Sequence, residues 1–332
     1  MQSKSTGRDC APVFVIGSAR SGTTLMYHTL LSSGLFPVYL GEPAVFDLLR
    51  PKFGNLQRRG NRERLMKCWL RSSMYRISHL EGEVIQEQVL NHCTSAGEFL
   101  RLVMGEVARL QGKMRWAVWG PDNLLYLRQI KKEIPDALFI HMIRDGRDVA
   151  ISMNKEGWIR PLPWDRKQGL VISALHWKWK VTHGIEAGRA LSADYLEVHF
   201  EELLDRRTVV LQKISAFIGQ EVKPDQIMQG SLGTMVIPNT SFQEESRSHE
   251  FRPLERWRRL LSESELRAVE SAIGPLLERL GYELAAKPCD NRRLRNRVMN
   301  QVYPRYFDIK LWLKENTLLG MLTNTDRMKL SQ

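Results

Sequence analysis

The feature that most constrains the fold lies near the start of the chain, where a glycine-rich turn separates two apolar segments. Val13–Ile16 is short and fully apolar, as a buried strand is, and Leu25–Leu31 has the composition of a helix. Between them, Gly17–Thr24 reads Gly-Ser-Ala-Arg-Ser-Gly-Thr-Thr. A strand, a glycine-rich turn and a helix in this order direct backbone N–H groups toward an anion. The sequence therefore predicts an anion-binding loop on an α/β sheet.

The loop departs from an ATP-binding loop at one position. Its two glycines have the G-x-x-x-x-G spacing, and Thr24 stands where the serine or threonine belongs. The lysine that should follow the second glycine is replaced by Thr23, and a cation appears earlier, at Arg20. The loop therefore suits a phosphate-like group but not the β- and γ-phosphates of a magnesium nucleotide. A glycine-rich turn that only packs a helix on a sheet is the structural alternative.

A second candidate element lies far downstream. Ala137–Ile143 is almost wholly apolar and predicts a buried parallel strand that ends at Arg144. Open α/β sheets bind ligands at the carboxyl ends of their strands, and the planar fork of an arginine suits phosphate. Ser152 follows Arg144 by eight positions. The structural alternative is that the charged run Arg144–Asp148 forms a salt-bridge cluster on the surface.

Strand-like and helix-like segments alternate along most of the 332 residues. This alternation predicts a mostly parallel sheet flanked by helices on both faces. Pro37–Leu40 is predicted as a short strand or extended turn. The other predicted strands are Val13–Gly17, Arg115–Trp119, Ala137–Ile143 and Tyr195–Phe200.

The loop Arg20–Leu25, together with the Arg144 and Ser152 pair, resembles the sulfotransferases that use 3′-phosphoadenylyl sulfate. The resemblance is strongest to the branch that contains bacterial and tyrosylprotein sulfotransferases. It implies a P-loop NTPase-like fold in a sulfotransferase domain over residues 12–284. A flexible N-terminus, residues 1–11, precedes this domain, and a basic, aromatic-containing extension, residues 285–332, follows it.

The resemblance also implies a donor site. Sulfuryl transfer from 3′-phosphoadenylyl sulfate to a hydroxyl or amine releases adenosine 3′,5′-bisphosphate, and no metal is expected. The loop is expected to hold the 5′-phosphosulfate and neutralise the leaving phosphate, while Arg144 and Ser152 grip the 3′-phosphate. The predicted donor-binding residues are Arg20, Ser21, Gly22, Thr23, Thr24, Arg144 and Ser152.

Glu42 is the predicted general base, and Arg20 is the second predicted catalytic residue. In the tyrosylprotein sulfotransferases a glutamate after a glycine at this point in the chain accepts the proton, and Glu42 follows Gly41. Cytosolic relatives use a histidine instead. His79 and His92 lie in the corresponding region, but neither has a matching motif.

Two positions depart from the family pattern. Relatives often carry a lysine in the turn that here reads Gly120–Asn123, where it helps the leaving group. Relatives also often have a tyrosine where this chain has Phe200. Without this lysine, either Arg20 stabilises the leaving group in its place, or the activity is altered or lost. This leaves open, as one alternative, an inactive nucleotide-binding or membrane-docked partner protein. An ATP-dependent phosphotransferase is the other alternative, and the absence of a lysine after Gly22 argues against it.

The net charge of +12 is compatible with a polyanionic ligand, and no nucleic-acid-binding motif accompanies it. The start of the chain lacks an apolar signal core, and no apolar run reaches the length of a membrane span, so a cytoplasmic location is expected. The four cysteines lie far apart, which argues against disulfides and structural zinc. The acceptor is left open among glycan, lipid, peptide and small molecule.

Aromatic residues gather in two stretches outside these motifs. Trp158, Trp164, Trp177 and Trp179 form either a stacking wall for a ligand or part of the core. The tail segment Val302–Leu322 mixes aromatic and basic residues. It is compatible with a lid, a dimer contact or peripheral contact with an anionic membrane.

Overall fold

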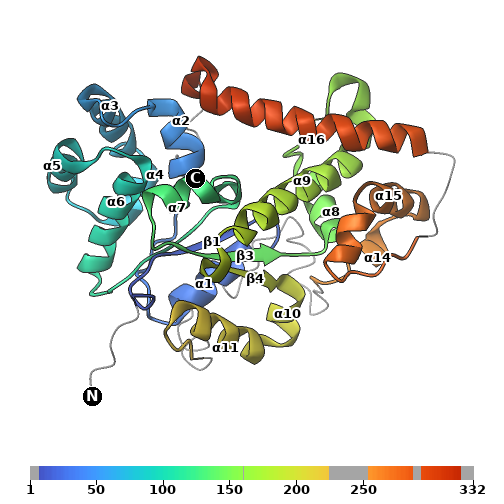
Figure 1. Ribbon diagram of the computed structural model, residues 1–332, viewed down its shortest axis with the longest axis horizontal. Coiled ribbons are helices and arrows are strands. Elements are labelled where there is room, and N and C mark those ends of the chain that lie inside the picture. The colour runs from blue at the N-terminus through green and yellow to red at the C-terminus, as the bar shows by residue number, and fades with distance from the viewer. Residues whose placement is uncertain (1–6, 160, 224–252, 287–292, 323–332) are drawn as a thin grey trace.

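The centre of the fold is a parallel sheet. The computed structural model describes residues 7–159, 161–223, 253–286 and 293–322 (Figure 1). Within these ranges, the strands are β1 (Val13–Gly17), β2 (Ala117–Trp119), β3 (Leu138–Ile143) and β4 (Tyr195–His199). They are all parallel, in the order β2-β1-β3-β4. Since parallel strands end at the same edge, the segments that follow β1, β2 and β3 are neighbours in space.

The helices complete an α/β fold. They are η1 (Val45–Leu49), α2 (Arg50–Phe53), α3 (Arg59–Trp69), α4 (Ser73–Ser78), α5 (Gly82–His92), α6 (Ala96–Leu110), η2 (Pro121–Leu125), α7 (Leu127–Glu133), η3 (Pro163–Gln168), η4 (Ser192–Asp194), α14 (Trp257–Leu260) and η6 (Leu318–Leu322), besides those named with their contacts below. No helix in the described ranges is long and apolar enough to cross a bilayer.

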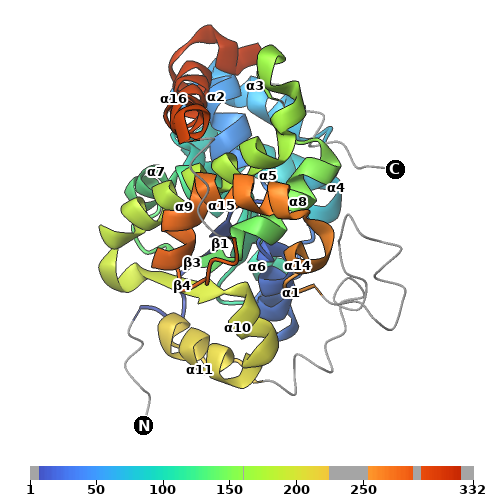
Figure 2. The same ribbon diagram turned by 90° about the vertical axis from the view of Figure 1, so that its right-hand side faces the viewer.

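The sheet is apolar on both faces, because alternate residues of a strand point to opposite sides. In β1, Phe14 and Ile16 enter a core that residues of α3 and α6 share, whereas Val13 and Val15 enter a core with α1 (Thr23–Ser32). Figures 1 and 2 show α1, α10 (Phe200–Asp205) and α11 (Arg207–Ile218) on one side of the sheet. Helix α9 (Gly169–Arg189) lies on the other side. The predicted mostly parallel sheet with helices on both faces is confirmed.

A third apolar cluster joins α9 to α8 (Gly146–Glu156), α15 (Glu263–Arg279) and α16 (Arg293–Asn316). Tyr303 and Phe307 of α16 are buried in it. Helix α15 begins with a capping box between Ser262 and Glu265. The inner face of α16 is therefore part of the folded core. The domain boundary predicted at 284 stays a prediction.

Two predicted strands, 115–119 and 195–200, are shorter than expected. Arg115 precedes β2, and its buried guanidinium donates to the carbonyls of Ala11 (2.9 Å) and Ile218 (2.9 Å). Residues 37–40 pair with no strand in the described structure, which leaves the extended turn of the two alternatives predicted there. Phe200 begins α10 instead of ending β4, and its ring packs against the loop after β1.

Candidate functional site

The loop after β1 has an open, left-handed backbone geometry. Arg20 and Gly22 have φ values of 69° and 86°. A Cβ atom on Gly22 would lie 2.3 Å from the ring of Phe200, so only glycine fits there. Gly22 precedes α1 without a side-chain cap, which leaves the first N–H groups of this helix directed into the loop. The loop therefore has the backbone of an anion-binding site.

Two hydroxyl groups of this loop are buried without a hydrogen-bond partner among the described residues. They belong to Ser18 and Ser21, whose side chains are inaccessible to solvent. Thr23 is buried and Thr24 half-buried at the start of α1. Because an unpaired buried hydroxyl is costly, such groups are typical of a site that a polar ligand completes.

Arg144 connects the end of β3 to this loop. Its guanidinium is buried and donates to the carbonyl oxygens of Arg20 (3.0 Å) and Pro253 (2.5 Å). It lies 4.3 Å from the ring centroid of Phe200, which therefore touches both Gly22 and Arg144. The Nε of Arg144 has no hydrogen-bond partner among the described atoms. Burial lowers the pKa of Arg144, and the nearby carboxylates Asp148 and Glu201 only partly offset this.

Ser152 meets the loop from α8. Its hydroxyl accepts a hydrogen bond from Nε of Arg20 at 2.9 Å. The Arg20 guanidinium also lies 5.4 Å from the ring centroid of Trp158, and its pKa is lowered by burial and by the charge of Arg144. Arg20 thus contacts Ser152 through its side chain and Arg144 through its carbonyl. The structure brings the two predicted donor elements together.

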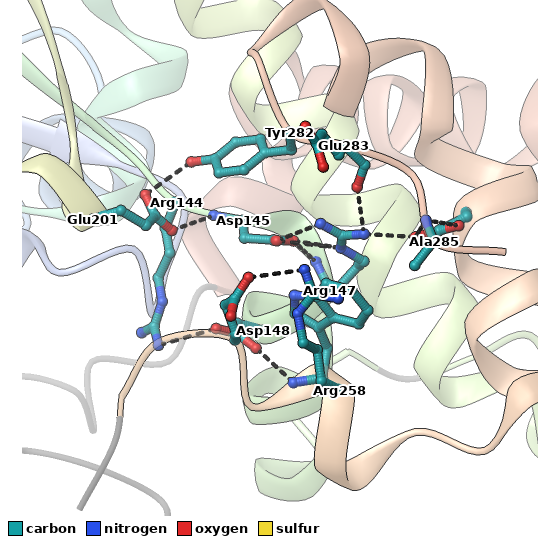
Figure 3. Close-up of polar contacts among 12 residues, drawn as sticks. Arg144, Asp145, Arg147, Asp148, Glu201, Arg258, Tyr282, Glu283 and Ala285 are labelled. Carbon is teal, nitrogen blue, oxygen red and sulfur yellow. Dashed lines mark hydrogen bonds and ion pairs between the residues drawn. The ribbon is translucent and has the colours of Figure 1, made fainter.

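Arg147, in contrast, is fully matched by acids (Figure 3). It donates to Asp145 through Nη2 (2.7 Å) and to Glu270 of α15 through Nη1 (2.6 Å), and it stacks 3.8 Å from the ring centroid of Trp257. Burial acts to lower its pKa, but the bonds and charges of Asp145 and Glu270 outweigh burial and raise it. The predicted alternative of a surface salt-bridge cluster is therefore wrong in location. The cluster is buried and links α8 to α15.

The acids nearest Arg144 have other partners. Asp148 lies 3.8 Å from the Arg144 guanidinium, and its Oδ1 accepts the backbone N–H of Trp257 at 2.9 Å. Burial raises the pKa of Asp148 to about 6. Glu201 accepts the N–H of Asp145 (3.0 Å) and the hydroxyl of Tyr282 (2.9 Å), as Figure 3 shows. The charge of Arg144 is therefore balanced less closely than that of Arg147.

Glu42 lies at the same edge of the sheet, beside the turn after β2. Its Oε1 would be 3.4 Å from a Cβ atom on Gly120, whose N–H donates to the carbonyl of Val15 in β1 (3.3 Å). Glu42 is half-buried. The described structure therefore places the predicted base next to β1, on the side away from β3.

The turn Gly120–Asn123 has no lysine in its own sequence, but a lysine from another helix contacts it. Lys180 of α9 is buried and donates to the carbonyl of Pro121 (3.2 Å) and to the carboxylate of Asp122. Sequence reasoning missed Lys180 because its partners lie far away in the chain, and no motif marks it.

The remaining candidates separate into core and surface. Trp177 and Trp179 are buried, whereas Trp158 and Trp164 are exposed, so the four tryptophans do not form one wall. His79 and His92 are exposed at the ends of α4 and α5. No group of three or more His, Cys, Asp or Glu side chains in the described ranges is arranged to hold a metal, and metal-independent chemistry stays a prediction.

Comparison with known proteins identifies the family. A family model described as the sulfotransferase family matches residues 12–224. A search of the curated proteins found no match. Among solved structures, the chain is similar to the sulfotransferase domain of the olefin synthase of Synechococcus PCC 7002, at 14% identity and a TM-score of 0.52, over 82% of this chain and 96% of that one.

Two further structures are similar at lower scores. The sulfotransferase domain from the curacin biosynthetic pathway is 13% identical with a TM-score of 0.49, over 82% of this chain and 98% of that one. Mouse sulfotransferase SULT7A1, complexed with PAP, is 13% identical with a TM-score of 0.43, over 90% of this chain and 89% of that one. At such identities the likeness to the Synechococcus domain supports the fold alone.

Proposed function

The chain belongs to the sulfotransferase family, and from that premise we propose that it transfers a sulfuryl group from 3′-phosphoadenylyl sulfate to an acceptor hydroxyl or amine. The observation that carries the proposal is the meeting of Arg20, Arg144 and Ser152 through bonds of 2.9 and 3.0 Å. A donor with phosphate groups at both the 3′ and 5′ positions needs two cationic sites close together, which these residues provide.

The residues present fit such a donor. The buried hydroxyls of Ser18 and Ser21 and the Nε of Arg144 are polar atoms without partners among the described residues. The N–H groups at the start of α1, with Thr23 and Thr24, would hold the 5′-phosphosulfate. Arg144 and Ser152 would hold the 3′-phosphate. When bound, the donor supplies the sulfuryl group and leaves as adenosine 3′,5′-bisphosphate.

Two side chains would act on the reacting groups. Arg20 would neutralise the negative charge that develops on the leaving 5′-phosphate as its bond to sulfur breaks. Glu42 would accept the proton of the acceptor as the new bond from oxygen or nitrogen to sulfur forms. The place of Glu42 beside β1 supports this role, since the loop after β1 would hold the sulfuryl group.

Transfer of radiolabelled sulfate from the donor into a cell extract tests the function and identifies the acceptor class. We expect labelled product with the wild type and with Glu87→Gln, an exposed glutamate on α5. Glu42→Gln should lower turnover by about two to four powers of ten while adenosine 3′,5′-bisphosphate still binds.

Other outcomes would redirect the assignment. Equal turnover in Glu42→Gln would remove Glu42 as the base. Nucleotide binding without any transfer would favour an inactive partner protein, and magnesium-dependent ATP binding would favour a phosphotransferase.

A further inference from the structure

The outer face of α16 is unusually apolar for a surface helix. Val298, Val302, Ile309 and Trp312 follow one another at helical spacing, and all four are exposed, Ile309 and Trp312 by 58% and 59%. The opposite face already packs on the core through Tyr303 and Phe307. The apolar stripe is therefore not needed to attach α16 to the fold.

The apolar surface continues past the end of the helix. In η6, Leu318 and Leu322 are 78% and 77% exposed, and Leu319 is 54% exposed. The turn is fixed to the body of the protein, since Lys52 donates to the carbonyl of Met321 (3.5 Å). Figures 1 and 2 show α16 along one edge of the molecule, with its C-terminal end beside α2. Such a continuous exposed patch is typical of an interaction surface.

The charge within this patch is cationic. Arg305 lies within the stripe, between Val302 and Ile309; it is exposed and is not paired with an acid among the described residues. The two acids of the same helix have inward partners. Asp308 accepts the indole N–H of Trp179 (2.8 Å), and Glu315 lies 3.8 Å from Arg50.

We propose that the outer face of α16 and η6, comprising Val298, Val302, Arg305, Ile309, Trp312, Leu318, Leu319 and Leu322, docks on an anionic lipid bilayer. Leucines and a tryptophan beside an unpaired arginine are typical of segments that lie in the membrane interface. A second copy of the chain would place like charges against one another, which disfavours self-association. The proposal does not depend on the identity of the donor.

Sedimentation with vesicles tests the proposal on the full chain. The wild type should bind vesicles of phosphatidylcholine mixed with phosphatidylglycerol more tightly than vesicles of phosphatidylcholine alone, and added salt should reduce the difference. Leu318→Ser combined with Leu322→Ser should weaken binding by at least about tenfold, because two leucines no longer enter the interface. Arg305→Glu should reduce the preference for anionic vesicles, with a loss of about fivefold or more.

The matched control is Leu110→Ser combined with Met114→Ser, which removes two exposed apolar side chains at the end of α6 and just beyond it. It should bind as the wild type does, and circular dichroism should show that every variant is folded. Wild-type protein that ignores anionic vesicles, or a leucine variant that binds them unchanged, would overturn the proposal. A concentration-dependent dimer that the leucine variant disrupts, without vesicle binding, would instead make this face a self-contact.

Discussion

Arg144 and Arg147 are three positions apart, just before and just inside the start of α8, yet they have different surroundings. Arg147 donates to Asp145 and Glu270, and its pKa is raised. Arg144 donates mainly to carbonyl oxygens, lies 3.8 Å from Asp148, and has its pKa lowered by burial. The comparison teaches that Arg147 is matched by acids that join α8 to α15, whereas Arg144, matched mainly by carbonyls, is the arginine to which the proposed function assigns an anion.

The largest expected effect sharpens the structural side of this comparison. Arg147→Ala would leave Asp145 and Glu270 buried without their cation, so we expect the free energy of unfolding to fall by about 3–5 kcal/mol. Arg144→Ala should cost only about 1–2 kcal/mol, since it removes hydrogen bonds to carbonyls. Urea unfolding of both variants measures the difference. Equal losses would contradict the separation of roles.

The pH dependence of stability tests how far the charge of Arg144 offsets the burial of the Asp148 carboxylate. Burial raises the pKa of Asp148 to about 6 from 3.8, so the folded state binds more protons than the unfolded state between these values. The contribution of Asp148 to stability therefore falls as the pH rises through this window, by up to about 3 kcal/mol.

Asp148→Asn removes this titration. We expect the stability of the variant relative to the wild type to improve between pH 4 and about pH 6 and then to level off toward pH 7, measured by urea unfolding at each pH. A constant difference across this range would mean that Arg144 does compensate Asp148, and the contrast with Arg147 would weaken.

A smaller effect is expected at Gly22, where the absence of a Cβ atom lets the Phe200 ring pack against the loop after β1. Gly22→Ala adds a Cβ atom 2.3 Å from the Phe200 ring at a φ of 86°, so we expect a loss of about 2 kcal/mol in stability. Gly157→Ala is the matched control, because Gly157 has a φ of 64° with no atom within 4 Å of the added Cβ. It should cost about 1 kcal/mol. If the two variants lose the same stability, the contact with Phe200 does not constrain the loop.

The sequence was sufficient for the elements that local patterns determine. The apolar runs of β1 and β3, the glycine-rich turn and the placement of Arg144 at the end of a buried strand could all be predicted, because each depends on adjacent residues. The contact of Arg20 with Ser152 also agrees with the proposed convergence of the two elements.

Features that depend on distant partners could not be predicted. Nothing near Arg147 in the chain indicates that Glu270 is its second acidic partner. The sequence alone therefore could not distinguish the surroundings of Arg147 from those of Arg144. The contact of Lys180 with the turn at Pro121 and the packing of α16 on α9 likewise arise from tertiary structure.

The central claim is that Arg20, Arg144 and Ser152 form one site for a nucleotide with 3′- and 5′-phosphates. Calorimetric titration with adenosine 3′,5′-bisphosphate and with AMP, in the presence of EDTA, tests it most directly. The wild type and the exposed control Arg59→Ala should prefer the bisphosphate. Arg144→Ala should lose that preference, with affinity for the bisphosphate falling by about ten- to a hundredfold. A wild type that binds neither nucleotide, or an Arg144→Ala variant that keeps the full preference, would contradict the account.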